Sequence, residues 1–321
     1  MLRTVLAASF VLLVPLEGLT FAPAEGDRLR TTYEFEGEYS MESMVLLVDG
    51  EEMSGHGSMP RTNQTLSEER VFLDTYEKVE GARVTRLVRT FETIDSTRED
   101  EIEMPSGTES KSTAAESELE GLQVSFDWDA DEGDYVASFS EDGGDEELLE
   151  GLEASIDAAL FLPEGPVQEG DSWELPASAF ALFLAPGGHL KVETAQRSWS
   201  DAAVASVRGL EGDVTCTAGA EVELNGERLM EIMLVVDVET SVELEGDVSE
   251  GEARNETSYE LSGLLLWNLE QGRLNSVELA GDVRMLGVTV KTVEMGESSF
   301  ETERRYEIAG EASISLEVES E

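Results

Sequence analysis

The chain has 321 residues, of which 71 are acidic and 21 are basic, and its formal net charge is −50. A charge of this size and sign repels nucleic acid and anionic membrane surfaces, so neither is expected as a partner. The hydrophobic fraction of 40% is high enough to build a folded core. A compact state of so acidic a chain requires screening by salt or cations, and the surface suits a saline medium.

A positive residue precedes a short apolar run at the N-terminus. Arg3 is followed by the apolar stretch 5–14, which is the layout of a secretory signal. We therefore predict a signal peptide over residues 1–18 and a secreted or periplasmic location. The run is too short for a stable membrane span, which needs about 20 apolar residues. Cleavage after Gly18 and cleavage after Ala24 both remain open.

A single cysteine, Cys216, excludes any disulfide within the chain. An exported protein of this kind must therefore be held together by burial of apolar side chains rather than by covalent cross-links. Because Cys216 lies between two threonines, we predict that it is a small buried residue of a strand.

Polar and apolar residues alternate with period two along most of the sequence, which predicts strands with one buried face. The first such segment covers residues 29–41. Asp49–Gly50 predicts a tight hairpin turn, because both residues tolerate positive φ. Further turns are expected at 79–82, 129–133 and 270–273. Consecutive hairpins predict an antiparallel meander.

The second half contains longer segments of the same kind, at residues 232–244, 259–267, 274–286, 288–293 and 314–318. Strands of ten or more residues are typical of strongly curved sheets and barrels. The predicted fold class is therefore mostly β: a curved antiparallel sheet or half-barrel built from hairpin meanders, with one amphipathic helix inserted mid-chain.

Two stretches depart from the alternation. Residues 95–120 are polar and acidic, which predicts a long loop. Residues 145–160 place leucine, isoleucine and alanine on one helical face behind Asp145 as a cap, which predicts a helix that packs on the concave side of the sheet. A second short helical turn is expected at 177–184.

The expected organisation has four parts. The leader covers 1–18, an N-terminal meander covers 19–140, a helical connecting segment covers 141–188, and a C-terminal meander covers 189–321. We expect the two meanders to form one domain.

The chain offers little for catalysis. Gly170–Asp171–Ser172 is similar to a nucleophile motif of one esterase class, but the histidine and aspartate that should follow near the C-terminus are absent. The only histidines are His56 and His189. We therefore expect no enzyme activity, no catalytic residue and no cofactor. We interpret Pro166 to Gly170 as a turn of the chain, which Trp173 anchors in the core.

Two segments carry metal-ligand types, and for each the alternative is an ordinary turn or loop. Alternating acids over Asp127–Asp134 could bind calcium weakly, although Glu132 stands where calcium loops need glycine. Met53, His56 and Met59 could hold Cu(I), which prefers thioether and imidazole ligands. The identity of any metal ligand stays open.

Three short segments together resemble an uncharacterised family of secreted bacterial β-rich proteins. They are Phe21–Asp27, Leu162–Trp173 and Leu266–Gly272, and the second contains the pattern Pro-Val-x-x-Gly-Asp-Ser-Trp. The resemblance implies a leader, two sets of strands and this segment between them, and it carries no activity or catalytic residue. It also implies that Phe21–Gly26 belongs to the mature protein.

These observations favour an exported, non-enzymatic β-protein that binds a lipid or other apolar small molecule in a groove between sheet and helix. The alternative is an acidic protein that binds divalent cations or another surface.

Overall fold

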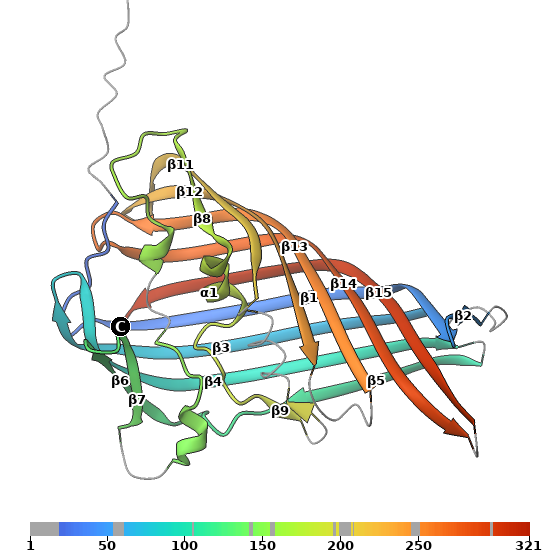
Figure 1. Cartoon of the computed structure of the whole chain (residues 1–321). Helices are drawn as coiled ribbons and strands as arrows, with labels where there is room; N and C mark the ends of the chain where they lie inside the picture. Colours follow the sequence, from blue (N-terminus) through green and yellow to red (C-terminus); the bar gives the residue numbers. More distant parts are fainter. Residues whose placement is uncertain are drawn as a thin grey trace, which may run out of the picture.

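The period-two segments form one antiparallel sheet of 13 strands in the computed structural model (Figure 1). The structure describes residues 19–53, 61–104, 106–140, 144–154, 158–194, 197–198, 207, 209–244, 251–295 and 298–321. The strands of the sheet are β1 (Arg28–Val48), β2 (Glu51–Glu52), β3 (Arg61–Glu80), β4 (Arg83–Met104), β5 (Gly107–Ala115), β6 (Gln123–Asp129), β7 (Asp134–Phe139), β8 (Ser172–Pro176), β11 (Glu211–Leu224), β12 (Glu227–Leu244), β13 (Gly251–Asn268), β14 (Arg273–Met295) and β15 (Ser298–Ser320). A separate hairpin is formed by β9 (Glu193–Thr194) and β10 (Arg197–Ser198).

The order of the strands is β7-β6-β4-β3-β1-β15-β14-β13-β12-β11-β8, with β2 paired to β1 and β5 paired to β4. The first and last long strands join the two meanders, because β1 pairs with β15 from Leu29 opposite Ser320 to Val48 opposite Thr302. The sheet is curved but is not closed into a barrel (Figure 1). The predicted fold class is confirmed.

The predicted hairpin turns are also confirmed. Asp49 and Gly50 have φ values of 49° and 80°, the left-handed region that this tight turn requires. The turns between β3 and β4, between β6 and β7, and between β13 and β14 fall where the sequence places them. The segments 274–286 and 288–293 were expected as two strands, but they form the single strand β14.

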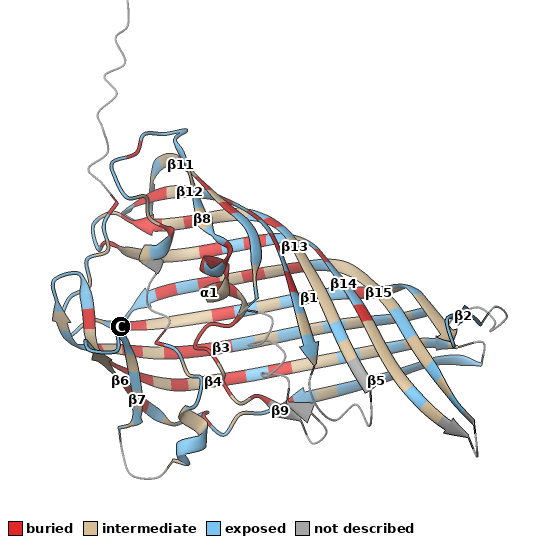
Figure 2. Ribbon diagram, viewed as in Figure 1, coloured by how far each residue is buried: buried red, intermediate tan, exposed pale blue. Residues whose placement is uncertain are grey.

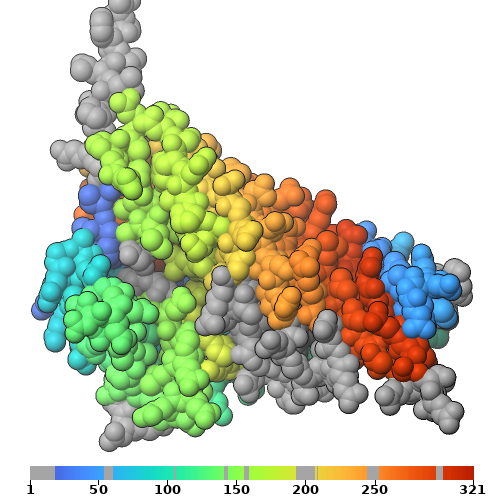
Figure 3. Space-filling model, viewed as in Figure 1, coloured from blue at the N-terminus to red at the C-terminus, as the bar shows by residue number. Residues whose placement is uncertain are grey.

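The mid-chain segment, comprising the described residues between 144 and 188, lies in front of the sheet at one end in the view of Figure 1, and its atoms face the viewer in Figure 3. It contains the 3₁₀ turns η1 (Glu146–Leu149), η2 (Ala158–Phe161) and η3 (Ala177–Phe180) and the helix α1 (Ala181–Leu184). Buried residues gather beneath it, and the far ends of the strands are intermediate or exposed (Figure 2). The largest fully buried apolar side chains include Trp267, Phe91, Phe126, Phe161, Phe180 and Phe183. No helix in the described ranges is long and apolar enough to cross a membrane.

The helix predicted at 145–160 is wrong, although a mid-chain helix exists at α1, where the short turn 177–184 was expected. Asp145 does cap a turn, since its side chain accepts from the backbone N–H of Glu147, but that turn is η1. Gly151 then adopts φ 78°, and Leu152 forms a β-bridge with Gly188. Contacts with other parts of the same chain therefore outweigh the helical periodicity of this stretch.

The long loop predicted at 95–120 is also wrong, because most of it continues the sheet. Strand β4 extends to Met104 and β5 pairs with it from Ser96 opposite Ala115 onward. Polar pairs replace apolar packing here: Arg98 forms an ion pair of 2.7 Å with Asp100 on the same face. A low apolar content therefore does not exclude a strand whose neighbours satisfy its backbone hydrogen bonds.

Glycines on three adjacent strands allow the backbones of the curved sheet to approach one another closely. A Cβ atom at Gly263 of β13 would clash with the carbonyl oxygen of Glu278, and one at Gly310 of β15 would clash with that of Glu38. Gly281 of β14, which lies between them, is equally confined. The curvature of the sheet thus depends on the missing side chains.

We expect Gly263→Ala to lower the free energy of unfolding by about 1–3 kcal/mol, because strand β14 must move to admit the methyl group. Urea unfolding measures the change. Gly165→Ala is the control, since a Cβ atom there meets nothing within 4 Å. Equal stability of the two variants would show that the strands adjust freely.

Candidate functional site

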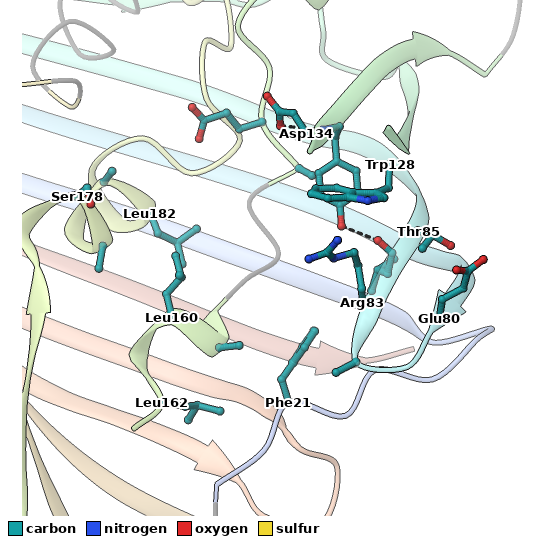
Figure 4. Close-up of a pocket in the computed structure, with 18 of the residues that line it drawn as sticks. Phe21, Glu80, Arg83, Thr85, Trp128, Asp134, Leu160, Leu162, Ser178 and Leu182 are labelled. Carbon is teal, nitrogen blue, oxygen red and sulfur yellow. Dashed lines mark hydrogen bonds between the residues drawn. The ribbon is translucent and has the colours of Figure 1, made fainter. Parts of the chain in front are cut away.

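A cleft of about 1240 Å³ lies between the mid-chain segment and two hairpin turns of the sheet (Figure 4). The turns are β3–β4 and β6–β7, and the chain before β1 forms a third side. The lining residues are Leu19, Thr20, Phe21, Glu80, Ala82, Arg83, Val84, Thr85, Trp128, Ala130, Asp134, Tyr135, Leu152, Glu153, Ala154, Ala159, Leu160, Leu162, Ser178, Ala179, Ala181 and Leu182. Most of these side chains are apolar, so the cleft is amphipathic rather than polar.

One side of the cleft is apolar. Leu160 and Leu162 come from η2 and the residue after it, and Leu182 comes from α1. Figure 4 shows them on the side of the cleft opposite Arg83 and Trp128. Leu160 is 55% exposed, and it lines the cleft together with Leu162 and Leu182. This exposed apolar surface is available to a ligand.

The opposite side is polar and is built on the β6–β7 hairpin. Trp128 and Tyr135 face each other across this hairpin, and their rings meet edge to face at 5.2 Å between centroids. The Tyr135 hydroxyl donates to the carbonyl oxygen of Val84, which ties β7 to the β3–β4 turn. Arg83 places its guanidinium 4.0 Å from the centroid of the Trp128 ring. Trp128, packed edge to face on Tyr135, thus contacts one cation at this end of the cleft.

The chain before β1 contributes a wall of the cleft. Leu19 is buried, and Phe21 lines the cleft beside the β3–β4 turn. Backbone hydrogen bonds hold this segment, since Ala22 N donates to Gly272 O at 2.9 Å and Gly26 N donates to Tyr76 O at 2.8 Å. The predicted signal peptide, 1–18, lies outside the described residues. Cleavage after Ala24 would remove this wall, whereas cleavage after Gly18 would keep it.

A buried ion pair supports the floor of the cleft. Nε and Nη2 of Arg89 each lie 2.8 Å from a carboxylate oxygen of Asp74. The remaining donors of Arg89 reach the mid-chain segment, at 3.1 Å from the carbonyl oxygen of Glu153 and 2.7 Å from that of Ala154. Both latter residues line the cleft. Arg89 therefore fixes the mid-chain wall to the sheet.

The sequence analysis did not predict the buried ion pair of Arg89 with Asp74 or the hydrogen bonds of Arg89 to the mid-chain segment. The available signal was an arginine at an inward position of β4, between Leu87 and Phe91, which are both fully buried. A charge in such a row requires a partner in the core. The partner, Asp74, sits on β3, and a small cavity of about 60 Å³ lies beside the pair.

The chain turns just before strand β8, where Asp171 N donates to Gln168 O at 2.9 Å, and Ser172 and Trp173 are the first two residues of that strand. Gly170 has φ 90°, and Trp173 donates from Nε1 to the carbonyl oxygen of Phe161 at 3.1 Å. The Ser172 hydroxyl lies 2.9 Å from that of Thr217 on the neighbouring strand. His189 lies elsewhere, against Gly151, whose carbonyl oxygen accepts from its backbone N–H at 2.8 Å.

Of the two segments with metal-ligand residue types, the structure describes the acidic one, 127–134, and only Met53 of the other. The Asp129 carboxylate accepts from the backbone N–H groups of Asp131 and Glu132 at 2.8 and 3.2 Å, so it stabilises the β6–β7 turn. Met53 is exposed, and His56 and Met59 lie outside the described residues. In the part of the chain that the structure describes, no group of three or more His, Cys, Asp or Glu side chains could hold a metal ion. Cys216 is buried, as predicted, and burial raises the pKa of its thiol to about 12.

The acidic residues are organised on the convex face of the sheet. Six carboxylates occupy directly opposed positions on adjacent strands, and we call them the carboxylate row: Asp213, Asp237, Glu260, Asp282, Glu311 and Glu38. They follow the strand order from β11 to β1. Like charges that face each other across strands are destabilising, so the row is a cost to the fold.

Comparison with known proteins adds no family to these observations. No protein-family model matches the chain, and no curated protein matches it either. The resemblance to secreted bacterial β-rich proteins therefore remains a prediction from the three short segments described above. The geometry of the cleft and the distribution of charge are the observations on which a function can be based.

Proposed function

We propose that this chain is an exported, non-enzymatic protein that binds an apolar or amphipathic small molecule in the cleft. The observation that carries the proposal is the half-exposed Leu160, which forms an apolar wall with Leu162 and Leu182. The cleft volume of about 1240 Å³ is slightly above the usual range for small-molecule sites, about 300–1,000 Å³. A long apolar chain is the ligand that such a wall favours, because its burial removes apolar surface from water.

The chemistry of the lining supports binding rather than catalysis. Its titratable groups are Glu80, Arg83, Asp134, Tyr135 and Glu153, and its alcohols are threonines and a serine. Neither histidine nor cysteine is among the lining residues of the described chain, so its alcohols lack the usual general base. The proposal includes export, with cleavage after Gly18, because that cut leaves Leu19 and Phe21 in the wall.

The carboxylate row supports a second candidate, a protein that binds divalent cations at its convex surface. Opposed carboxylates on neighbouring strands lie about 4.5–5.5 Å apart at their Cβ atoms, which is close enough for one cation to contact two of them. The cleft remains the better candidate, because Leu160 exposes more than half of its side chain there, beside Leu162 and Leu182.

Binding in the cleft can be tested with N-phenyl-1-naphthylamine, an uncharged apolar probe whose fluorescence rises in apolar surroundings. We expect saturable binding to the purified full chain, and about tenfold weaker binding to Leu160→Asp, because the substitution places a charge on the apolar wall. Native mass spectrometry of the protein as purified would in addition detect a retained lipid.

Leu286→Asp is the matched control, since Leu286 is a similarly exposed leucine on strand β14, away from the cleft lining. This variant should bind the probe as the unaltered protein does. Equal weakening by the two substitutions, or no saturable binding at all, would contradict the proposal.

A further inference from the structure

Arg83 is placed at the polar end of the cleft in a way that suits recognition of an anion. Its guanidinium carbon lies over the Trp128 ring, 4.0 Å from the ring centroid. Arginine commonly stacks on aromatic rings in this way, which leaves its N–H donors free at the edge of the group. Figure 4 shows the side chain directed from the β3–β4 turn toward the space between Trp128 and Leu160. Contact with Trp128 restricts the orientation of the paired N–H donors of Arg83 before any ligand binds, which lowers the entropy cost of binding.

No carboxylate of the described residues neutralises Arg83. Nine arginines form ion pairs within 4.0 Å among the described residues, whereas Arg83, like Arg61, Arg273, Arg284 and Arg304, forms none; of these five, only Arg83 lines the cleft. The nine are Arg28, Arg30, Arg70, Arg86, Arg89, Arg98, Arg228, Arg254 and Arg305. Glu80 faces Arg83 across the turn, yet its carboxylate points away in Figure 4. Asp134 accepts from the backbone N–H of Tyr135 at 2.7 Å. The N–H donors of Arg83 are therefore not engaged in an ion pair with the described residues, although Glu80, Asp134 and Glu153 also line the cleft.

We infer that the ligand of the cleft is an anionic amphiphile. Its head group, a carboxylate in the simplest case, pairs with the edge of the Arg83 guanidinium, and its apolar chain lies against Leu160 and Leu182. This inference rests on the proposed function and names the class of ligand. The net charge of −50 repels such a ligand at long range, but physiological salt screens charges that are more than about 8 Å apart. The contact with Arg83 therefore decides the affinity.

The test compares three probes with the same chain and different heads: dodecanoate, dodecan-1-ol and dodecylamine. Each displaces N-phenyl-1-naphthylamine from the full chain at physiological salt. We expect dodecanoate to bind more tightly than dodecan-1-ol, and Arg83→Gln to weaken dodecanoate binding about tenfold while leaving dodecan-1-ol unchanged. Arg83→Lys should retain part of the preference, because it keeps the charge but loses the fork.

Arg86→Gln is the matched control, since Arg86 lies on the same strand but pairs with Glu77 and Asp127 rather than lining the cleft. This variant should keep the preference for dodecanoate. Equal binding of the acid and the alcohol, tighter binding of the amine, or an equal loss of both acid and alcohol in Arg83→Gln would overturn the anionic head group. Such results would still be consistent with binding of an apolar ligand in the cleft. If none of the three probes bound, the proposed function itself would be contradicted.

Discussion

Arg89→Met is expected to lower the free energy of unfolding by about 3–5 kcal/mol, the usual effect of removing one partner of a buried ion pair. Arg89 is 2% exposed, and Asp74 is 5% exposed. Without the guanidinium, the Asp74 carboxylate loses two hydrogen bonds of 2.8 Å and stays buried as an uncompensated charge. The carbonyl oxygens of Glu153 and Ala154 lose their donors as well.

Urea unfolding monitored by tryptophan fluorescence measures the loss. Arg86→Met provides the control, because the ion pair of Arg86 with Glu77 is about one-third to one-half exposed, and such pairs contribute about 0–1 kcal/mol. The double variant Arg89→Met with Asp74→Leu should be more stable than Arg89→Met alone, since it no longer buries a charge. A double variant that is less stable than both single variants would show that the charge of Asp74 is not the main cost.

The same substitution tests the link between Arg89 and the cleft. Arg89 joins the sheet to the residues that line the cleft from the mid-chain segment, so its loss should free that wall to move. Hydrogen exchange at amides of 149–154 should become faster in Arg89→Met than global unfolding alone explains. The exchange of amides in the β14–β15 pairing should report only the change in global stability.

The sheet was predictable because its signals are local. Period-two alternation and turns such as Asp49–Gly50 depend on neighbouring residues, and they identified both meanders. The stretch 95–120 has the composition of a loop, because both of its faces are polar. Most of it belongs to the sheet only because β4 pairs with β3 on one side and with β5 on the other. The stretch 145–160 has helical periodicity, but the positive φ of Gly151 and the hydrogen bonds of Arg89 to the carbonyl oxygens of Glu153 and Ala154 keep residues 151–154 out of a helix.

The candidate site could not be assembled from the sequence, because its parts are distant along the chain. Leu19, Arg83, Trp128, Leu160 and Leu182 meet only after the hairpins and the mid-chain segment are in place. The sequence predicts a groove between the sheet and the mid-chain segment, but the helix predicted to form it does not occur in the described residues of 145–160. No local pattern distinguished Arg83 from the other arginines, since its lack of an ion partner is a property of the folded chain.

The carboxylate row predicts that the protein is markedly more stable at high salt. Each of its five opposed pairs costs about 0.2–1 kcal/mol, so replacing Asp237 by Asn together with Glu260 by Gln should raise the free energy of unfolding by about 1–2 kcal/mol at low salt. The gain should nearly vanish at 1 M NaCl, because the Debye length falls from about 30 Å at 0.01 M to about 3 Å. Urea unfolding at both salt concentrations measures it.

The control must separate the effect of the opposed carboxylates on stability from the effect of lowering the net charge. Glu36→Gln with Glu278→Gln also removes two negative charges, but these carboxylates face serine or leucine on the neighbouring strands. If net charge alone governs stability, the two double variants will gain equally. We expect the larger gain from the row, because an opposed pair at contact distance interacts more strongly than charges separated by one or more strands.

Divalent cations separate screening from binding at the row. Screening depends on ionic strength, so it predicts equal stability in NaCl and CaCl₂ solutions of the same ionic strength. A cation held between opposed carboxylates would add stability by mass action, because it binds the folded chain in preference to the unfolded one. An extra rise of the melting temperature in CaCl₂ that disappears in the Asp237→Asn, Glu260→Gln variant would therefore support the second candidate function. Equal melting temperatures in the two salts would leave the row as a charge cost that a saline medium relieves.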